Sequence, residues 1–577
     1  MNKGSVIIFS FLFHLMCISD TISALDFYVG ADLSYVNELE DCGVIYKDQT
    51  GELTDPYQIF ADEGANVIRL RLWHNPEWTN YSNLEDVRKS IKRSKDAGMT
   101  VLLDFHYSDF WADPGRNWRP QAWEAIDDDQ ILGDSLYDYT FQVLKSLDEE
   151  GLLPEMVQIG NETNGNILIK RENADIAGTT PGLYPIDWNR QSMLFNRALE
   201  AVVDIETLTQ QELKTVIHVA NPGSATSWFD AAFAFDLKDF DIIGLSYYPQ
   251  WHEIDIRGVG DYVRDLRERF SKEIMIVEVG YPWNTSGIGD NAGNVLGTSS
   301  RMNTRSAFSE EEQRDFLIEL TWLVKENGGL GVIYWEPAWV SSSCQTYWGT
   351  GSHYENATFF DYDNTLHEGG IRYLSYDYSH MPEGLQEQII VFKVNMKHID
   401  TQNGVFITGD FTGEDWQFVE MQNEESDVYF TEVQIPGRTE GAFAFYKDDQ
   451  WSNQAIEQVP EFCAVNWGSH RNYAIKNTSR TYEYAWSSCN SQLVAQPLHF
   501  PNDVPKSLIY PNPANDFVTI DVAEEVVAVK LFHISGKELT LPKSNGETIC
   551  IEGFKSGVYF LEIIFPSGSQ RVKLLKQ

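Results

Sequence analysis

The stretch QIGNETNG, residues 158–165, ends an apolar run with an amide and a carboxylate. Residues 156–159 have the composition of a buried strand, and Asn161 and Glu162 follow between two glycines. Burying an unpaired carboxylate is costly, so Glu162 is either a solvated turn residue or a charge that the fold uses. The strand pattern of the rest of the chain decides between these two interpretations.

Eight short apolar strands are predicted between residues 25 and 385. They lie at 27–34, 67–73, 100–107, 156–162, 215–221, 241–249, 274–282 and 331–339. Helical patterns separate them, for example 309–328, which opens with Ser309 and Glu312 as a capping box. Strands that alternate with helices pair in parallel, and eight such units predict an α/β fold, the (β/α)8 or TIM barrel.

A second carboxylate, Glu278, ends the seventh predicted strand in IMIVEVGYPW (274–283). Active sites of TIM barrels lie at the C-terminal ends of the strands, so Glu162 and Glu278 should face one another across the barrel mouth. Two carboxylates in this position can flank a glycosidic bond, one as proton donor and the other as nucleophile. Two unrelated solvated acids are the alternative interpretation.

Motifs at nearly every predicted strand end resemble those of glycoside hydrolase family 53, the arabinogalactan endo-β-1,4-galactanases. They are GADLSYVNELEDCGVIY (30–46), GANVIRLRLWHNP (64–76), DFHYSDFWADPGRNWRPQAW (104–123), QIGNETNG (158–165), GLSYYPQWH (244–252), IVEVGYPW (276–283) and YWEPAW (334–339). The resemblance covers residues 25–385 and implies Glu162 as acid/base and Glu278 as nucleophile of a retaining enzyme that cuts the galactan side chains of pectin. The alternatives are a related enzyme acting on mannan, xylan or glucan, and an inactive barrel that only binds glycans.

Further cleft residues are expected at the other strand ends. The predicted substrate-binding residues are Asn161, Arg71, His106, Asp109, Trp111, Tyr247, Trp283 and Trp335. The resemblance implies that Asn161 contacts the 2-hydroxyl of the substrate. Arg71 would hold Glu278 ionised, or form a plain structural ion pair, and Tyr247 would orient Glu278. Each tryptophan would stack on a sugar ring, with core packing as the alternative.

The resemblance also implies a structural calcium in the loop after the seventh strand, NTSGIGDNAGNVLG (284–297). Asp290, Asn291 and Asn294 would supply oxygen ligands. The loop has a single carboxylate, so a glycine-rich loop without an ion is the alternative. No other cofactor is expected.

The formal net charge of the chain is −43, from 43 basic and 86 acidic residues. Such a charge argues against nucleic acid, anionic membranes and polyanionic substrates as partners and favours a neutral substrate. Residues 1–24 have the pattern of a secretory signal peptide, whose apolar stretch is too short to span a bilayer.

Five cysteines follow the predicted signal peptide, and none forms a CxxC pair, which argues against a zinc cluster. Disulfides are permitted in an exported protein. Cys463 and Cys489 lie in one predicted domain and are expected to pair, Cys42 and Cys344 would form a second bridge, and Cys550 would be left over.

Beyond the barrel, residues 387–490 alternate in polarity as in an antiparallel β-sandwich. This segment resembles starch-binding-type carbohydrate modules, with Trp416, Trp451 and Trp467 as a sugar platform, and an inert spacer is the alternative. Residues 491–507 are expected to be a linker. Residues 508–577, which open with LIYPNPANDF, form a second small β-sandwich that resembles the C-terminal sorting domain of type IX secretion. That resemblance implies recognition by the secretion machinery and a place outside, or on the outer surface of, a Gram-negative cell.

Overall fold

The computed structural model describes residues 27–171, 182–252, 254–285, 289–290, 292–297 and 308–413, then most of 415–489 and the strand segments within 509–576. Two compact units divide the chain after Ser491. The predicted signal peptide lies outside the described residues and stays a prediction. No helix in the described ranges is long and apolar enough to cross a membrane.

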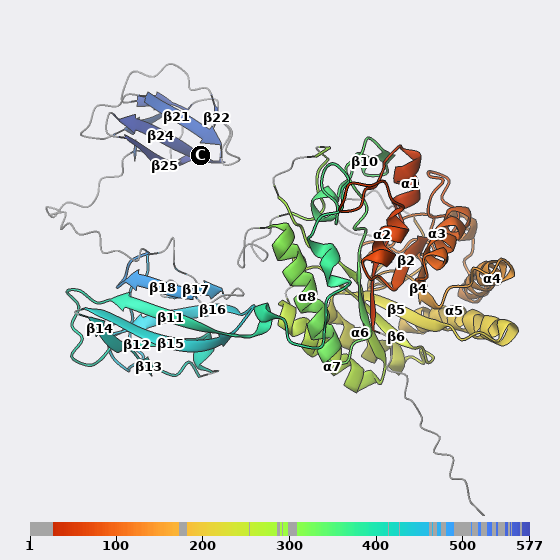
Figure 1. The fold of residues 1–577 in the computed structure, drawn as a ribbon, viewed down its shortest axis with the longest axis horizontal. Helices are drawn as coiled ribbons and strands as arrows, with labels where there is room; N and C mark the ends of the chain where they lie inside the picture. The colour runs from red at the N-terminus through yellow and green to blue at the C-terminus, as the bar shows by residue number, and fades with distance from the viewer. Residues whose placement is uncertain are drawn as a thin grey trace, which may run out of the picture. The chain divides into compact units, whose positions relative to one another are not determined.

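Eight parallel strands close into a barrel in sequence order, which confirms the predicted TIM barrel (Figure 1). They are β1 Tyr28–Asp32, β2 Val67–Leu72, β3 Thr100–Phe105, β4 Met156–Ile159, β5 Lys214–Ala220, β6 Ile242–Tyr247, β7 Glu273–Val279 and β8 Gly331–Tyr334. The barrel closes where β1 pairs with β8. Several strands end two or more residues earlier than predicted, because the polar residues at their ends already belong to the loops of the catalytic face.

Eight helices of the described chain surround the strands (Figure 1). They are α1 Val36–Asp41, α2 Pro56–Asp62, α3 Leu84–Asp96, α4 Asp129–Glu149, α5 Trp188–Thr209, α6 Pro222–Ala234, α7 Ile256–Phe270 and α8 Glu310–Glu326. The Ser309 side chain accepts a bond from the Glu312 N–H, as the capping signature predicts. Helix α4 begins at Asp129, because the side chain of Asp128 caps the N–H groups of Gln130 and Ile131.

The barrel interior is apolar at its floor and polar at its mouth. The floor is a buried cluster with members from every strand: Tyr28, Val67, Leu102, Met156, Val216, Ile242, Met275, Val277, Leu330 and Ile333. Burying these side chains excludes water from the barrel interior beneath the active site. The polar side chains lie above this apolar floor, at the barrel mouth.

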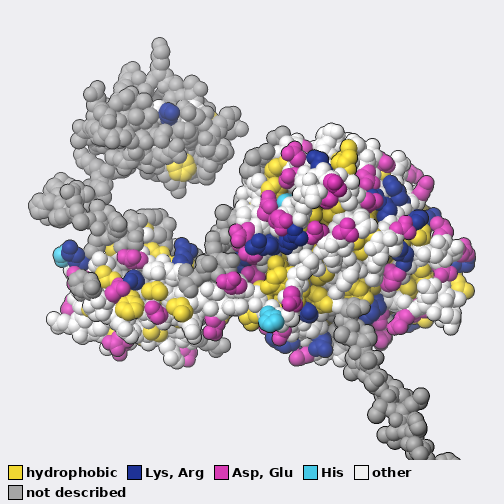
Figure 2. Space-filling view, in the orientation of Figure 1, with side chains coloured by type: hydrophobic (Ala, Val, Ile, Leu, Met, Phe, Trp, Pro, Cys, Tyr) yellow, Lys and Arg dark blue, Asp and Glu magenta, His cyan; other side chains and the backbone are white. Residues whose placement is uncertain are grey.

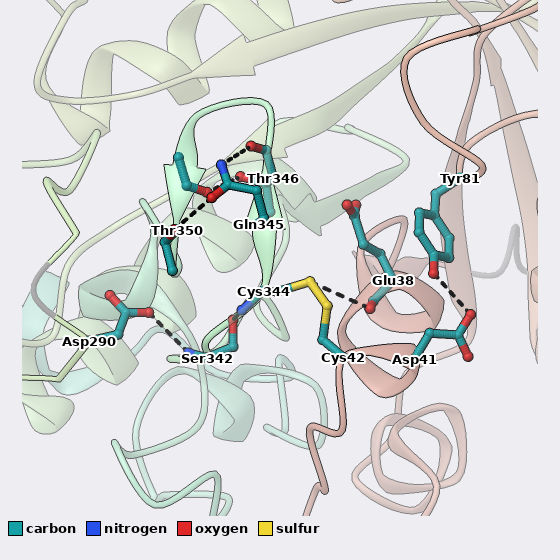
Figure 3. The surroundings of a disulfide bond; sticks show 11 residues. Glu38, Asp41, Cys42, Tyr81, Asp290, Ser342, Cys344, Gln345, Thr346 and Thr350 are labelled. Atoms are coloured by element: carbon teal, nitrogen blue, oxygen red, sulfur yellow. Dashed lines mark hydrogen bonds between the residues drawn. A yellow bond between two sulfur atoms is a disulfide. The ribbon is translucent and has the colours of Figure 1, made fainter.

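A disulfide between Cys42 and Cys344 ties the end of α1 to the loop after β8 (Figure 3). The two Cα atoms lie 5.4 Å apart, and 302 residues separate the cysteines in sequence. The expected second bridge of the sequence analysis is confirmed. Cys489 is disulfide-bonded, but its expected partner Cys463 lies outside the described residues, so that pairing stays a prediction.

The middle domain is a sandwich of two four-stranded sheets, β14-β15-β11-β18 and β13-β12-β16-β17. Its strands are β11 Glu387–Asn395, β12 Phe406–Gly409, β13 Val419–Glu420, β14 Gln422–Glu425, β15 Val428–Pro436, β16 Glu440–Tyr446, β17 Arg471–Ala474 and β18 Arg480–Ala485. The pairing is antiparallel as predicted except between β11 and β18, which run parallel. The turn between β15 and β16 contacts the barrel, where Arg438 is 3% exposed and pairs with both Glu312 and Glu319 of α8.

The C-terminal unit is a second small β-sandwich and is described by itself. Its sheets are β19-β20-β23 and β22-β21-β24-β25. The strands are β19 Ile509–Tyr510, β20 Phe517–Ile520, β21 Ala528–His533, β22 Glu538–Leu539, β23 Thr548–Cys550, β24 Gly557–Phe565 and β25 Gly568–Lys576. A buried apolar cluster of its own, including Val518, Leu531 and Leu561, holds the two sheets together.

Candidate active site

A cleft of about 380 Å³ opens at the C-terminal ends of the barrel strands. Seven of the predicted site residues line it: Glu162, Glu278, Asn161, Arg71, His106, Trp111 and Trp335. The structure adds others that the sequence analysis missed, among them Arg69, Tyr248, Trp251 and Trp348. The structure thus brings both predicted carboxylates into one cavity.

One polar side chain from each of seven strands forms a layer at the bottom of this cleft. The residues are Asp32, Arg69, Asp104, Gln158, His218, Ser246 and Glu278, from β1 to β7 in order. Each is at least 95% buried. Buried polar groups require hydrogen-bond partners, and here neighbouring strands supply them to one another. These hydrogen bonds link the seven side chains into one network, which fixes their positions at the catalytic face.

Glu278 is held by two donors. Nη2 of Arg69 lies 2.9 Å from its Oε1, and the Tyr248 hydroxyl donates to its Oε2 at 3.0 Å. Burial raises the pKa of Glu278 to about 7, while the Arg69 charge opposes this effect. Both donors favour the ionised carboxylate, which is the form that a nucleophile needs.

Two predictions about the partners of Glu278 require correction. Arg71 pairs with Glu336, 3.1 Å away, and not with Glu278, which confirms the alternative of a structural ion pair. Its guanidinium lies 4.2 Å from the ring centroid of Trp111, so it also supports that aromatic wall. Arg69 and Arg71 share a strand face because side chains alternate with a period of two, and Arg69 is the one at the level of Glu278.

Tyr247 was expected to orient Glu278, but its hydroxyl donates to the carbonyl of Ile254, 3.0 Å away. The neighbouring Tyr248 occupies the expected position instead. The strand alternation puts Ser246 and Tyr248 on the cleft side and Tyr247 on the helix side. A register shift between Leu245 and Ser246 in the pairing with β7 occurs at the same point.

Glu162 lies three residues beyond β4 and has a left-handed backbone, with φ of 44°. Strained backbone of this kind concentrates at functional sites. Ser246 Oγ lies 2.6 Å from its Oε1. Burial and the charge of Glu278 raise the pKa of Glu162 well above its usual value. The two carboxyls therefore share one proton near neutral pH, and Glu162 is the group that keeps it.

Asn161 and His106 are both fixed by hydrogen bonds at the cleft wall. Asn161 Oδ1 accepts from Arg69 Nη2 at 2.7 Å, and its Nδ2 donates to the Ala112 carbonyl at 2.9 Å. His106 Nε2 lies 3.0 Å from Asp104, and its Nδ1 accepts the Ala112 N–H at 3.2 Å. Burial lowers the pKa of His106, so the ring is neutral with its proton on Nε2.

Asp109 and Trp283 do not line the cleft. Asp109 accepts backbone N–H bonds from Asn75 at 2.8 Å and Gln121 at 2.7 Å, and so joins the loops after β2 and β3. Trp283 packs against Tyr362 and His367, with ring centroids 5.1 and 5.2 Å away. Trp283 therefore packs in the core, as the alternative interpretation has it. Asp109 holds the two loops together by hydrogen bonds.

The missed residues carried weak sequence signals. Arg69 precedes Arg71 by one strand period, and Tyr248 follows the chosen tyrosine directly. Trp251 and Trp348 lie in loops and are 47% and 37% exposed at the cleft. A large tryptophan left half exposed beside a cleft suits a sugar-binding surface, but exposure cannot be read from sequence.

The predicted calcium ligands lie in a loop that is only partly described, because Asn291 is outside the described residues. Asp290 accepts backbone N–H bonds from Ala292, Ser342 and Ser352 at 3.0, 3.0 and 2.6 Å. Figure 3 shows the bond from Ser342. Burial and the charge of Asp290 raise the pKa of the nearby Glu355. The described residues hold no group of three acidic, His or Cys side chains suited to a metal, and calcium prefers six to eight oxygen ligands. The calcium site in this loop therefore stays a prediction.

A closed parallel barrel with two carboxylates in one cleft defines a glycoside hydrolase of the barrel class. Comparison with known families is more specific, since residues 28–369 match glycosyl hydrolase family 53. The chain belongs to that family. Residues 508–577 match the secretion system C-terminal sorting domain.

Relatives agree with this assignment. The chain is 50% identical over 335 residues to an arabinogalactan endo-β-1,4-galactanase of Cellvibrio japonicus, covering 58% of this chain and 86% of the relative. It is 33% identical to an endo-β-1,4-galactanase of Bacillus subtilis, covering 55% and 71%. The solved family 53 catalytic domain of Ignisphaera aggregans is 29% identical with a TM-score of 0.54, covering 61% of this chain and 97% of that one.

Proposed function

We propose that this protein is an exported endo-β-1,4-galactanase that hydrolyses galactan side chains of pectin with retention of configuration. One observation carries the proposal: the carboxylates of Glu162 and Glu278 share a cleft, and their environments separate their protonation states. The family membership supports galactan over the mannan, xylan and glucan alternatives. The intact carboxylate pair argues against a barrel that only binds glycans.

The chemistry follows from the two environments. Glu278, held ionised by Arg69 and Tyr248, attacks the anomeric carbon while protonated Glu162 gives its proton to the leaving oxygen. The resulting glycosyl-enzyme ester reacts with water, from which Glu162 takes a proton. Nδ2 of Asn161 retains one hydrogen beyond its bond to Ala112, and we assign that hydrogen to the 2-hydroxyl of the sugar.

The aromatic wall of the cleft supplies the sugar contacts. Trp111, Trp335, Trp348 and Trp251 line it, and flat apolar rings with polar edges suit the faces of a neutral pyranose. Acidic and basic side chains are interspersed on the drawn face of the barrel (Figure 2). With a net charge of −43, a neutral galactan is a better electrostatic match than the anionic pectin backbone.

The deciding experiment compares substrates. Purified enzyme is incubated with potato galactan, mannan, xylan and mixed-linkage β-glucan, and the products are separated by size. We expect oligosaccharides of intermediate length from galactan as the early products, and no release from the other polymers. Preferential release from mannan, xylan or glucan would contradict the substrate assignment. Inactivity on all four polymers would contradict the enzymatic assignment.

Export and processing extend the proposal. Residues 508–577 match a secretion sorting domain, so we infer that the type IX secretion machinery recognises this unit and delivers the enzyme to the cell surface or the medium. For the loop after β7, we infer that hydrogen bonds to Asp290 hold it without an ion. Both inferences are tested below.

A further inference from the structure

Two polar residues of the barrel interior, His218 of β5 and Ser246 of β6, have no role in the mechanism above. Both are fully buried. Ser246 Oγ lies 2.8 Å from His218 Nε2 and 2.6 Å from Oε1 of Glu162. The three side chains therefore form a line of hydrogen bonds that ends on the proposed acid/base.

The direction of this line depends on the single ring proton of His218. Burial and the charge of Arg69 lower the pKa of His218 well below its usual value, so the ring is neutral. A neutral imidazole has one donor nitrogen and one acceptor nitrogen. If Nε2 carries the proton, Ser246 accepts from it and must turn its own hydrogen toward Glu162.

The surroundings of Nδ1 favour this arrangement. Two donors meet Nδ1: the backbone N–H of Glu162 at 3.3 Å and Nε2 of Gln158 at 3.1 Å. The competing acceptor is Oδ1 of Asn161 at 2.8 Å. That oxygen already accepts from Arg69 Nη2 at 2.7 Å. Gln158 Nε2 also lies 2.7 Å from Asp104 Oδ1, so the Glu162 N–H is the donor that depends on Nδ1. A bare Nδ1 accepts from this N–H, whereas a protonated Nδ1 would oppose it.

We propose that His218 and Ser246 form a one-way chain of donors, from Nε2–H to Oγ and from O–H to Oε1 of Glu162, which leaves Oε2 to carry the catalytic proton. Oε1 then accepts from Ser246 in both protonation states of the acid. In the first step the proton leaves Oε2 for the glycosidic oxygen. In the second step Oε2 takes a proton from water. The protons of Ser246 and His218 do not move, so both are positioning residues.

The hydrogen-bond chain from His218 through Ser246 also affects the pKa of Glu162. Burial and the charge of Glu278 disfavour the ionised form of Glu162. A hydroxyl that donates to a carboxylate favours the ionised form and opposes these effects. Without the chain, Glu162 would hold its proton too tightly to give it up near neutral pH. This reasoning rests on the proposed acid/base role of Glu162.

The first test is the pH profile of kcat/KM with galactan. Replacing Ser246 by Ala removes the donor, and we expect the alkaline limb to move to higher pH by about 1 unit. His218→Asn keeps a polar atom near the Nδ1 position but places nothing at Nε2, so it should give a smaller shift in the same direction. Because the two residues act in series, the double variant should match Ser246→Ala.

A control variant and the direction of the alkaline-limb shift in Ser246→Ala decide whether the proposal holds. Ser227→Ala removes a hydroxyl of α6 that bonds only to the Ser224 carbonyl within its own helix, and it should leave the profile unchanged. A shift of the alkaline limb to lower pH in Ser246→Ala would mean that Ser246 accepts from protonated Glu162, with the chain reversed. No shift would mean that Ser246 and Glu162 are uncoupled. Either result would overturn the proposal.

The second test does not depend on activity and uses the unmodified enzyme. Nitrogen NMR of ¹⁵N-histidine-labelled protein distinguishes the two neutral ring forms, and the His218 signal is assigned by its loss in His218→Asn. We expect the Nε2–H form. The Nδ1–H form would overturn the proposed chain even if the enzyme cleaves galactan as described. Loss of galactanase activity with the Nε2–H form intact would count against the function and not against the chain.

Discussion

Arg69 is the single guanidinium that meets three carboxylates in the barrel mouth. Its Nη1 lies 2.8 Å from Asp32, and its Nη2 lies 2.8 Å from Asp104 and 2.9 Å from Glu278. One positive charge cannot neutralise three negative ones, so Asp104 and Asp32 both contribute to the raised pKa of Glu278. The nucleophile is therefore poised to lose its charge as the pH falls below about 7, and acid inactivation should follow.

Replacing either carboxylate should abolish activity for a different reason. Glu278→Ala removes covalent attack, and azide entering the gap should give a glycosyl azide of inverted configuration. Glu162→Ala removes proton donation, so an activated aryl galactoside should still form the intermediate, and azide should restore turnover with retained configuration. Product stereochemistry by proton NMR distinguishes the two.

Opposite stereochemistry in the two variants would reverse these roles. If neither variant lost more than about tenfold in kcat/KM, about 1.4 kcal/mol of barrier, the carboxylate-pair mechanism would be wrong.

Tyr247, the last residue of β6, and Tyr248, which follows it, offer a matched pair. Tyr248→Phe removes the hydroxyl that donates to Glu278 at 3.0 Å, which disfavours the ionised form. We therefore expect the acid limb of kcat/KM to move to higher pH, by about 0.5–1 unit. Tyr247→Phe removes a hydroxyl that donates to the Ile254 carbonyl outside the cleft. An equal shift in both variants would refute the assignment of Tyr248 to Glu278.

At the scale of elements, the sequence predicts the barrel well because each strand is a short apolar run bounded by helical periodicity. It also places Glu162 and Glu278 at the C-terminal ends of strands, where the active sites of TIM barrels lie. The errors at Arg71 and Tyr247 share a cause. Arg71 is two residues from Arg69, and Tyr247 is one residue from Tyr248. Neither the depth of a side chain nor a register shift such as that at Leu245 and Ser246 is visible in sequence.

The loop after β7 should not depend on calcium. Asp290 accepts three backbone N–H bonds that join this loop to the segment around Ser342 and Ser352. Adding EGTA should therefore leave the Tm unchanged within about 1 °C, because these hydrogen bonds join the two segments without an ion. Asp290→Ala, by contrast, should lower the Tm by several degrees, about 1–3 kcal/mol of lost hydrogen bonding. A fall in Tm with EGTA that calcium reverses would restore the predicted ion site.

The middle sandwich has one well-placed aromatic side chain for glycan binding. Trp451 is 58% exposed, with Phe418 and Tyr446 beside it at 4.8 and 5.6 Å between ring centroids. Trp416 instead donates to Asp410 at 3.1 Å and is partly buried, and Trp467 lies outside the described residues. The predicted three-tryptophan platform is thus reduced, among the described residues, to Trp451.

Affinity electrophoresis tests this domain. The segment 387–490 has its own apolar core, which includes Phe392, Ile407 and Phe443, and is expressed alone. We expect galactan in the gel to retard it, and Trp451→Ala to remove the retardation. Ile389→Ala, which also removes an exposed apolar side chain of this sandwich, should have no effect. Absence of retardation by galactan, starch and cellulose would favour an inert spacer.

At the scale of the whole molecule, charge and processing are connected. The chain carries 86 acidic against 43 basic residues, yet its last seven residues are RVKLLKQ, with three basic groups and no acidic one. Strand β25, which contains most of them, pairs along its length with β24. A receptor of the secretion machinery would therefore meet a basic edge strand on an otherwise acidic protein, which suits recognition by charge.

If this terminal unit serves only export, the mature enzyme should lack it. We expect protein recovered from the medium or surface of the native host to begin near residue 25 and to end near 507. Its intact mass should then be lower than that of the full chain by the mass of residues 1–24 and 508–577. The barrel has its own core and its own disulfide between Cys42 and Cys344, so removal of residues 508–577 should leave kcat/KM on galactan unchanged in the purified protein. A full-length C-terminus on the exported enzyme would contradict removal. A truncated chain that is still exported from the native host would contradict the sorting role itself, because the remaining residues would then suffice to direct it out of the cell.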